Sequence, residues 1–288
     1  MSDIRISILC PSRGRPKNLE RLVESALANA SKKEEIEFLF YIDDDDDTFA
    51  NFKPEAFSNL KIIRGKRLWI SVAQNFLYSQ SSGQIIMAAA DDFVFHTKGW
   101  DKLVSDAFAK SKDNLLLVYG SDMGTYKEKL AIYGFFHRDW IETIGYWTFP
   151  GRGSLYDLWA FEIAKRINRL EYLSQLEIEH IHYRQGEKKA DFDTTYADIY
   201  KASDSWRPKI TYKKLKRERW IDIILLCEKG EIKIPFDYSH ILSSYLYKII
   251  KKRISVTKRR RLLTMTNSEI IWSLFTLFYK KTRESLKR

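Results

Sequence analysis

The chain has 288 residues and a formal net charge of +11, from 49 Lys and Arg against 38 Asp and Glu. A hydrophobic content of 44% and an aromatic content of 14% exclude a disordered chain and allow a large core. Two cysteines, Cys10 and Cys227, exclude a disulfide framework and a cysteine zinc site. The first residues lack a signal-peptide pattern, and no stretch is apolar enough to span a membrane. We therefore expect a cytoplasmic protein.

The charge is unevenly distributed along the chain. Residues 205–288 hold 22 Lys and Arg against 7 Asp and Glu, a net charge of +15. Residues 1–204 hold 27 against 31, a net charge of −4. A weakly acidic body followed by a basic segment indicates two regions with different tasks. We predict one α/β domain over residues 1–204 and a basic, amphipathic helical region over residues 205–288.

Strand patterns and helix patterns alternate over the first 120 residues. Apolar residues recur with a period of two from Ile4 to Cys10, and a helical apolar stripe begins after Asn18. Further strands are expected at residues 36–42, 60–63, 85–90 and 115–119, and further helices around residues 72–77 and 100–108. This order predicts a mostly parallel central sheet with helices on both sides.

Polar clusters follow three of the predicted strands. They are Ser12-Arg13, the five aspartates Asp43 to Asp47, and the pair Asp91-Asp92. Ligands of such sheets bind beyond the carboxyl ends of the strands. Adjacent carboxylates there can hold Mg²⁺ or Mn²⁺, and such an ion neutralises charge on a departing diphosphate. The alternative is a solvated strand end with two surface aspartates.

Four short blocks of sequence follow one another in an order and at a spacing that carry a family resemblance. They are residues 6–16 (ISILCPSRGRP), 41–46 (YIDDDD), 71–86 (beginning SVAQN and ending SGQII) and 90–92 (ADD). This series resembles nucleotide-sugar-dependent glycosyltransferases with the GT-A fold, closest to family 2 and to related bacterial and phage enzymes. The last block lies where the family carries Asp-x-Asp, with Ala90 in place of the first aspartate. The resemblance implies a Rossmann-like three-layer sandwich and sugar transfer from a nucleotide-diphosphate sugar.

The resemblance also assigns roles to individual residues. It implies that the donor is bound by Pro11, Ser12, Arg13, Arg15, Asp43, Asn75 and Asp91, with Lys188 on a loop that closes over the diphosphate. It implies that Asp92 binds Mn²⁺ or Mg²⁺, with a late histidine as a further ligand.

Two histidines are candidates for that ligand. A predicted strand over residues 176–182 has a period of two, which puts His180 and His182 on one face with Leu176 and Ile178. Such a pair can bind a metal or be purely structural. The resemblance favours the metal and does not choose between the two histidines.

Asp157 lies in the first turn of a predicted helix. A carboxylate there interacts favourably with the helix dipole, so a purely structural role is one interpretation. The resemblance implies another, because many inverting members carry their catalytic base at the start of this helix. Such a base takes a proton from the acceptor hydroxyl. We therefore predict Asp157 as the base.

The basic region combines apolar stripes with runs of Lys and Arg. An apolar stripe over residues 241–250 precedes Lys251, Lys258 to Arg261 are four consecutive bases, and an apolar run over residues 270–279 precedes Lys280. This combination suits an anionic membrane surface. We therefore predict an enzyme at the inner membrane face with a glycan or lipid-linked acceptor of surface polysaccharide biosynthesis. The alternatives are a glycosyltransferase that modifies DNA, helices that pack on the catalytic domain, and a scaffold that keeps only the fold.

Overall fold

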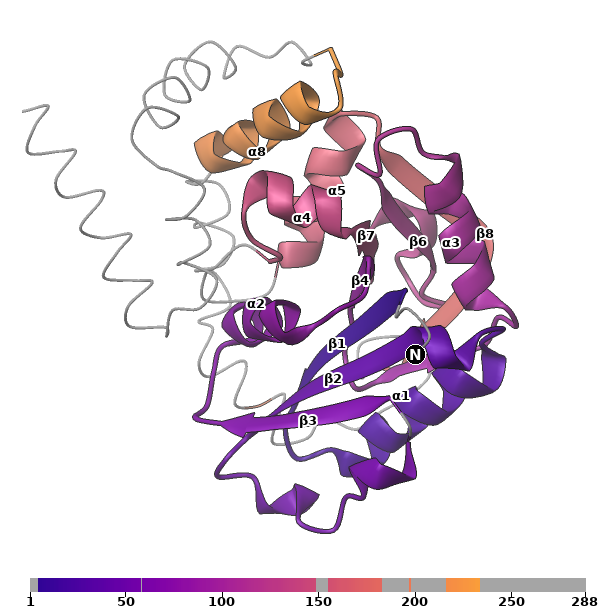
Figure 1. The fold of residues 1–288 in the computed structure, drawn as a ribbon, viewed down its shortest axis with the longest axis vertical. Coiled ribbons are helices and arrows are strands. Elements are labelled where there is room, and N and C mark those ends of the chain that lie inside the picture. Colours follow the sequence, from indigo (N-terminus) through magenta and orange to yellow (C-terminus); the bar gives the residue numbers. More distant parts are fainter. Residues whose placement is uncertain (1–4, 58, 149–154, 183–196, 198–215, 234–288) are drawn as a thin grey trace, which may run out of the picture.

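The computed structural model describes residues 5–57, 59–148, 155–182, 197 and 216–233 (Figure 1). The strands are β1 (Ile6–Ser12), β2 (Ile36–Asp43), β3 (Leu60–Gly65), β4 (Ile85–Ala88), β5 (Phe93–Phe95), β6 (Leu117–Ser121), β7 (Phe135–His137) and β8 (Leu170–His180). The α-helices are α1 (Pro16–Asn29), α2 (Ile70–Gln80), α3 (Trp100–Lys110), α4 (Arg138–Ile144), α5 (Tyr156–Arg166) and α8 (Lys216–Lys229). Short 3₁₀ turns are η1 (Lys33–Glu35), η2 (Asp47–Phe49), η3 (Pro54–Ala56) and η4 (Lys127–Lys129).

The strands form one eight-stranded sheet in the order β3-β2-β1-β4-β7-β6-β8-β5. The first four in this order run parallel, β7 is antiparallel to both neighbours, β8 is parallel to β6, and β5 is antiparallel to β8. The predicted α/β class with a largely parallel sheet is therefore confirmed. Because β1, β2 and β4 are parallel, their carboxyl ends lie at the same edge of the sheet.

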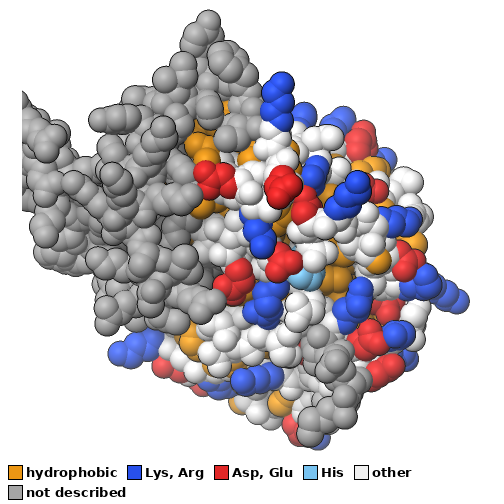
Figure 2. Space-filling view, turned by 45° about the horizontal axis from the view of Figure 1, so that its top comes forward, with side chains coloured by type: hydrophobic (Ala, Val, Ile, Leu, Met, Phe, Trp, Pro, Cys, Tyr) orange, Lys and Arg blue, Asp and Glu red, His pale blue; other side chains and the backbone are white. Residues whose placement is uncertain are grey.

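The surface drawn in Figure 2 carries acidic and basic side chains in close alternation. On this face the described residues do not gather into a patch of one sign. This face agrees with the near-balanced charge of residues 1–204.

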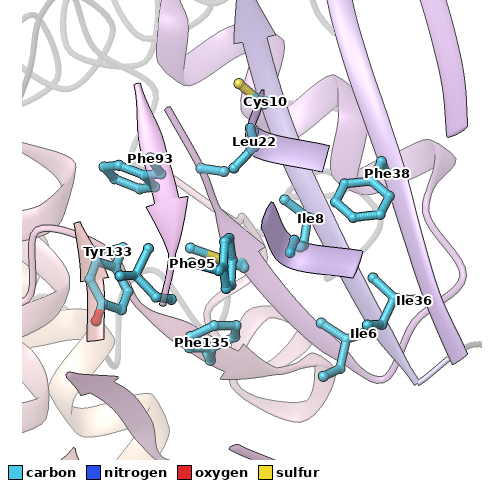
Figure 3. Close-up of a cluster of buried hydrophobic side chains, with 14 of the residues drawn as sticks. Ile6, Ile8, Cys10, Leu22, Ile36, Phe38, Phe93, Phe95, Tyr133 and Phe135 are labelled. Atoms are coloured by element: carbon cyan, nitrogen blue, oxygen red, sulfur yellow. The ribbon is translucent and has the colours of Figure 1, made fainter. Parts of the chain in front are cut away.

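The core lies on both faces of the sheet. Ile6 and Ile8 point from β1 into the cluster beneath α1 and α3, where Phe93 and Phe95 also pack (Figure 3). Leu9, the residue after Ile8, points into the second cluster, which α2, α4, α5 and α8 cover. A strand that is buried on both faces reads as continuously apolar, which is why residues 85–89 show no alternation.

Strand β8 begins earlier than the sequence pattern predicts. It pairs with β6 through Leu170 to Leu173 and then, past an irregularity at Gly120, continues toward β5. A side chain at position 120 would meet the carbonyl oxygen of Leu176 at 2.1 Å, so glycine is required for this close approach. The half of β8 near β6 lacks strict alternation, and this hid it from the period-two pattern.

Helix α8 is the part of the predicted basic region that the structure describes. Its Trp220, Ile223 and Leu226 are buried in the same cluster as Trp159 of α5 and Trp140 of α4. Helix α8 therefore packs on the α/β domain. The predicted boundary at residues 204 and 205 and the basic runs beyond residue 233 lie outside the described residues. Within the described ranges, no helix has the length and apolar character needed to cross a membrane.

Candidate active site

The carboxyl ends of β1 and β4 converge on Asp91, which is 6% exposed. The Ser12 hydroxyl donates a hydrogen bond to Asp91 Oδ2 at 2.6 Å, and Arg15 Nη1 lies 3.2 Å from Oδ1. Burial and the charge of Asp92 raise the pKa of Asp91, and Arg15 and Ser12 oppose this shift. Both oxygens of Asp91 are thus held in place, next to a second buried carboxylate.

Asp92 faces the end of β8. Its Oδ1 lies 3.3 Å from His180 Nε2, and its backbone carbonyl accepts a hydrogen bond from the Ile181 amide at 2.9 Å. The register of β5 against β8 pairs Phe93 with His180, which brings the two groups together. The His182 ring lies 5.1 Å from the His180 ring, so both predicted histidines are at this edge and His180 is the one in contact with Asp92.

We asked whether these residues fit a divalent ion. In the described part of the chain, no group of three or more His, Cys, Asp or Glu side chains is arranged to hold a metal. Asp92 and His180 provide one oxygen and one nitrogen ligand, a set that Mn²⁺ accepts more readily than the oxygen-seeking Mg²⁺. Such ions commonly complete their coordination with substrate phosphates and water. The residues therefore fit an ion shared with a phosphate-bearing substrate.

The acidic turn after β2 is tied to the loop after β1. Arg13 Nη1 lies 2.9 Å from Asp43 Oδ2 and 2.5 Å from Asp45 Oδ1. The Gly14 amide donates a hydrogen bond to Asp46 Oδ2 at 2.7 Å. We call Ser12, Arg13, Arg15, Asp43, Asp91 and Asp92 the sheet-edge group. Pro11 lies in β1 next to Ser12, so the structure brings together most of the predicted donor contacts.

Asp157 is the second residue of α5 and lies in its first turn. Its Oδ1 accepts a hydrogen bond from the Leu158 amide at 2.8 Å. Burial raises the pKa of the Asp157 carboxyl, and the charge of His180 partly opposes this shift. The preceding residue, Leu155, has φ 107°, a strained conformation for a residue with a side chain. The chain therefore enters α5 through a left-handed residue directly before Tyr156 and Asp157.

Tyr156 is a site residue that the sequence pattern missed. With Asp157, Trp147 and Thr148 it lines a cavity of about 30 Å³ that reaches Ala88 at the end of β4. Its position next to a predicted base was the one signal available in the sequence. We call Tyr156, Asp157, Trp147 and Thr148 the α5 group.

Asn75, a predicted donor contact, is 3% exposed and binds the protein itself. Its Nδ2 donates to the Thr148 carbonyl at 2.6 Å, and its Oδ1 accepts from the Trp147 amide at 2.7 Å. The neighbouring Gln74 donates to the Leu9 carbonyl at 3.2 Å and accepts from Trp147 Nε1 at 3.2 Å. Through these hydrogen bonds, helix α2 connects Trp147 and Thr148 of the α5 group to β1. Lys188 lies outside the described residues.

The largely parallel sheet flanked by helices is the arrangement of the GT-A fold, and its edge gathers paired carboxylates and a histidine. The chain belongs to glycosyl transferase family 2, because residues 7–161, more than half of its length, match the model of that family. It is therefore an enzyme that transfers a sugar from a nucleotide-sugar donor.

Two solved structures illustrate the fold. TarS 1-349 from S. aureus in complex with UDP-GlcNAc is similar over 90% of this chain and 78% of that one, with 13% identity and a TM-score of 0.51. The mannosyltransferase PcManGT from Pyrobaculum calidifontis, in complex with GDP-Man and Mn²⁺, is similar over 96% and 88%, with 11% identity and a TM-score of 0.50. No curated protein sequence matches the chain.

Proposed function

We propose that this enzyme moves a sugar from a nucleotide-diphosphate sugar to a hydroxyl of a glycan or lipid-linked acceptor. The observation that carries the proposal is the meeting of Asp92 and His180 at 3.3 Å, with Asp157 in electrostatic range of the same histidine. A diphosphate bound at Asp92 and His180 would leave the sugar facing Asp157. This is the order of groups that a transfer reaction needs.

The sheet-edge group would bind the donor. We assign the nucleoside to Asp43 and the Pro11–Arg13 loop, because Arg13 already holds the two elements together at 2.9 Å. We assign the ribose and diphosphate to Asp91, with Ser12 and Arg15 as its partners. The UDP-GlcNAc complex of TarS and the GDP-Man complex of PcManGT support a nucleoside diphosphate as the common ligand.

Asp92 and His180 would hold a divalent ion, and His182, whose ring lies 5.1 Å from the His180 ring, is the other candidate histidine ligand. When bound, the ion neutralises the charge that develops on the leaving diphosphate. Mn²⁺ is favoured over Mg²⁺ because one of the two ligands is an imidazole nitrogen. The Mn²⁺ in the PcManGT complex supports the same choice.

Asp157 would act as the catalytic base. Its carboxylate takes the proton of the acceptor hydroxyl while that oxygen attacks the anomeric carbon, and the bond from this carbon to the diphosphate breaks. Attack from the side opposite to the diphosphate gives inversion. The pKa of Asp157 is raised by burial, which makes it a stronger base than an exposed aspartate.

Binding of nucleotide and metal tests the proposal directly. We expect UDP or GDP to raise the thermal unfolding midpoint, and Mn²⁺ to increase that rise. At a free ligand concentration of 100 times Kd, binding adds about 2.7 kcal/mol to the unfolding free energy. Asp92→Asn should lose the Mn²⁺-dependent part alone. Asp106→Asn, at an exposed aspartate of α3, is the matched control. An Mn²⁺ effect that survives in Asp92→Asn would contradict the site.

The basic region supports a location at an anionic membrane. Residues 234–288 carry 13 Lys and Arg against 3 Asp and Glu, interleaved with apolar stripes. We expect the full chain to sediment with vesicles containing phosphatidylserine and to be released as salt rises, because each base near the surface contributes about 1 kcal/mol. Stronger binding to duplex DNA than to these vesicles in the same salt series would favour the DNA-modifying alternative.

A further inference from the structure

Tyr156 belongs to the α5 group, whose cavity reaches the end of β4. It is the first residue of α5, it precedes the proposed base Asp157, and it lines the cavity that reaches Ala88. Leu155, in its strained left-handed conformation, directs the chain into this position. The side chain of Tyr156 is half-buried, so it is ordered by packing and still reachable from the cavity.

The hydroxyl of Tyr156 differs from those of other buried tyrosines. Tyr41 donates to the Lys66 carbonyl at 2.6 Å, Tyr119 to the Glu128 carbonyl at 2.8 Å, and Tyr133 to the Ser121 carbonyl at 3.1 Å. Among the described residues, the Tyr156 hydroxyl makes no hydrogen bond of this kind. A half-buried hydroxyl without a protein acceptor is a group available to a ligand.

Electrostatics favours the protonated form of this hydroxyl. Burial raises the pKa of Tyr156, and the negative charges of Asp157 and Asp92 raise it further. Asp157 follows Tyr156 in the chain and lines the same cavity. A protonated phenol is a hydrogen-bond donor.

We propose that Tyr156 is a further catalytic residue, whose hydroxyl donates a hydrogen bond to an oxygen of the donor's sugar diphosphate beside Asp157. The inference rests on the proposed function, since it needs a nucleotide sugar bound at the sheet-edge group. An acceptor oxygen on a diphosphate is charged, and hydrogen bonds to charged groups are the strong ones. The same bond strengthens as the diphosphate departs and gains charge, which favours the transition state.

The substitution Tyr156→Phe tests the inference, because it removes the hydroxyl and keeps the ring in the cavity wall. We expect kcat/KM for the nucleotide sugar to fall about 10-fold to 100-fold, the range for a lost hydrogen bond to a charged group. The thermal unfolding midpoint should stay unchanged. Tyr126→Phe, at a tyrosine that is 43% exposed, is the matched control. Titration with the nucleoside diphosphate and with the nucleotide sugar then tells whether the phosphate or the sugar oxygen is bound.

Two results would overturn the inference. The first is a Tyr156→Phe enzyme within about two-fold of wild type while Tyr156→Ala is impaired, which would assign the ring to packing alone. The second is a loss in Tyr156→Phe that a lowered unfolding midpoint accompanies. Wild-type protein that turns over no nucleotide sugar would overturn the proposed function together with the inference. An active wild type with an unaltered Tyr156→Phe variant would overturn the inference alone.

Discussion

The sheet-edge group and the α5 group are held in place by different forces. The first relies on charged pairs between neighbouring strand ends, such as Arg13 with Asp43 and Arg15 with Asp91. The second relies on uncharged hydrogen bonds from Asn75 and on packing against α8, where Asp222 accepts from Trp159 Nε1 at 3.1 Å. The residues of the proposed donor side are therefore held by contacts between strand ends, and those of the proposed acceptor side by contacts with helices.

This contrast predicts which perturbations act on each side. Salt screens the partly exposed Arg13–Asp45 pair and screens the buried Arg15–Asp91 pair much less, whereas buried uncharged hydrogen bonds and packing are not screened. Removal of a buried hydrogen-bond partner costs about 1–3 kcal/mol for each group that is left unsatisfied. Variants that act on one group and spare the other should thus separate donor binding from transfer.

The largest separation is expected from Asp157→Asn. Without a base, kcat should fall about 10²-fold to 10⁴-fold, because general base catalysis contributes that much. Binding of the nucleoside diphosphate should stay at the wild-type level, since Asp157 is outside the sheet-edge group. The matched control is Asp139→Asn, at another first-turn aspartate, which has a helix-dipole interaction and no place at the site. Equal losses in both variants would show that Asp157 is merely structural.

The next separation concerns Asn75. Asn75→Ala leaves the Trp147 and Thr148 amides and the Thr148 carbonyl without their partner, so we expect about 2–4 kcal/mol less unfolding free energy in urea. The catalytic rate should fall, because the α5 group loses its anchor, and affinity for the nucleoside diphosphate should not change. Asn29→Ala, at a helix-terminal amide on the opposite face, is the control. A selective loss of nucleotide affinity would instead make Asn75 a donor contact, as the family resemblance implied.

The two groups also differed in how far the sequence could reveal them. Ser12, Asp43 and Asp91 each follow a strand with a clear pattern, and parallel strands necessarily bring their carboxyl ends to one edge. The sheet-edge group could therefore be predicted before any coordinates. The contact of His180 with Asp92 could be predicted as a type of ligand and not as a pairing, because it depends on the register of β5 against β8.

The α5 group could be predicted only in part. Asp157 was found through the resemblance, but Tyr156 is identified by what its hydroxyl lacks, and no pattern in one sequence contains that information. Likewise, Asn75 and Thr148 are 73 residues apart, and their hydrogen bond depends on how α2 packs. The burial of Trp220 with Trp159 of α5 was one of the stated alternatives for the basic region, and the sequence did not choose between it and a membrane surface.

The smallest expected effect is a difference in pH dependence between the two groups. Burial raises the pKa of Asp157, so its base form is lost, and kcat falls, at a pH above the ordinary aspartate value of about 3.9. Burial acts in the same sense on Asp46, but hydrogen bonds from Thr48 and Gly14 outweigh it and lower that pKa. A carboxyl with a lowered folded pKa stabilises the fold above its unfolded pKa and loses this contribution only as pH falls through the folded value.

As the pH is lowered, kcat at saturating donor should therefore fall first. The unfolding free energy that the acidic turn contributes should fall only at a lower pH. Asp46→Asn should flatten the stability profile at low pH and leave the acid limb of kcat in place. Parallel decline of both quantities in the wild type would show that the two groups titrate as one unit.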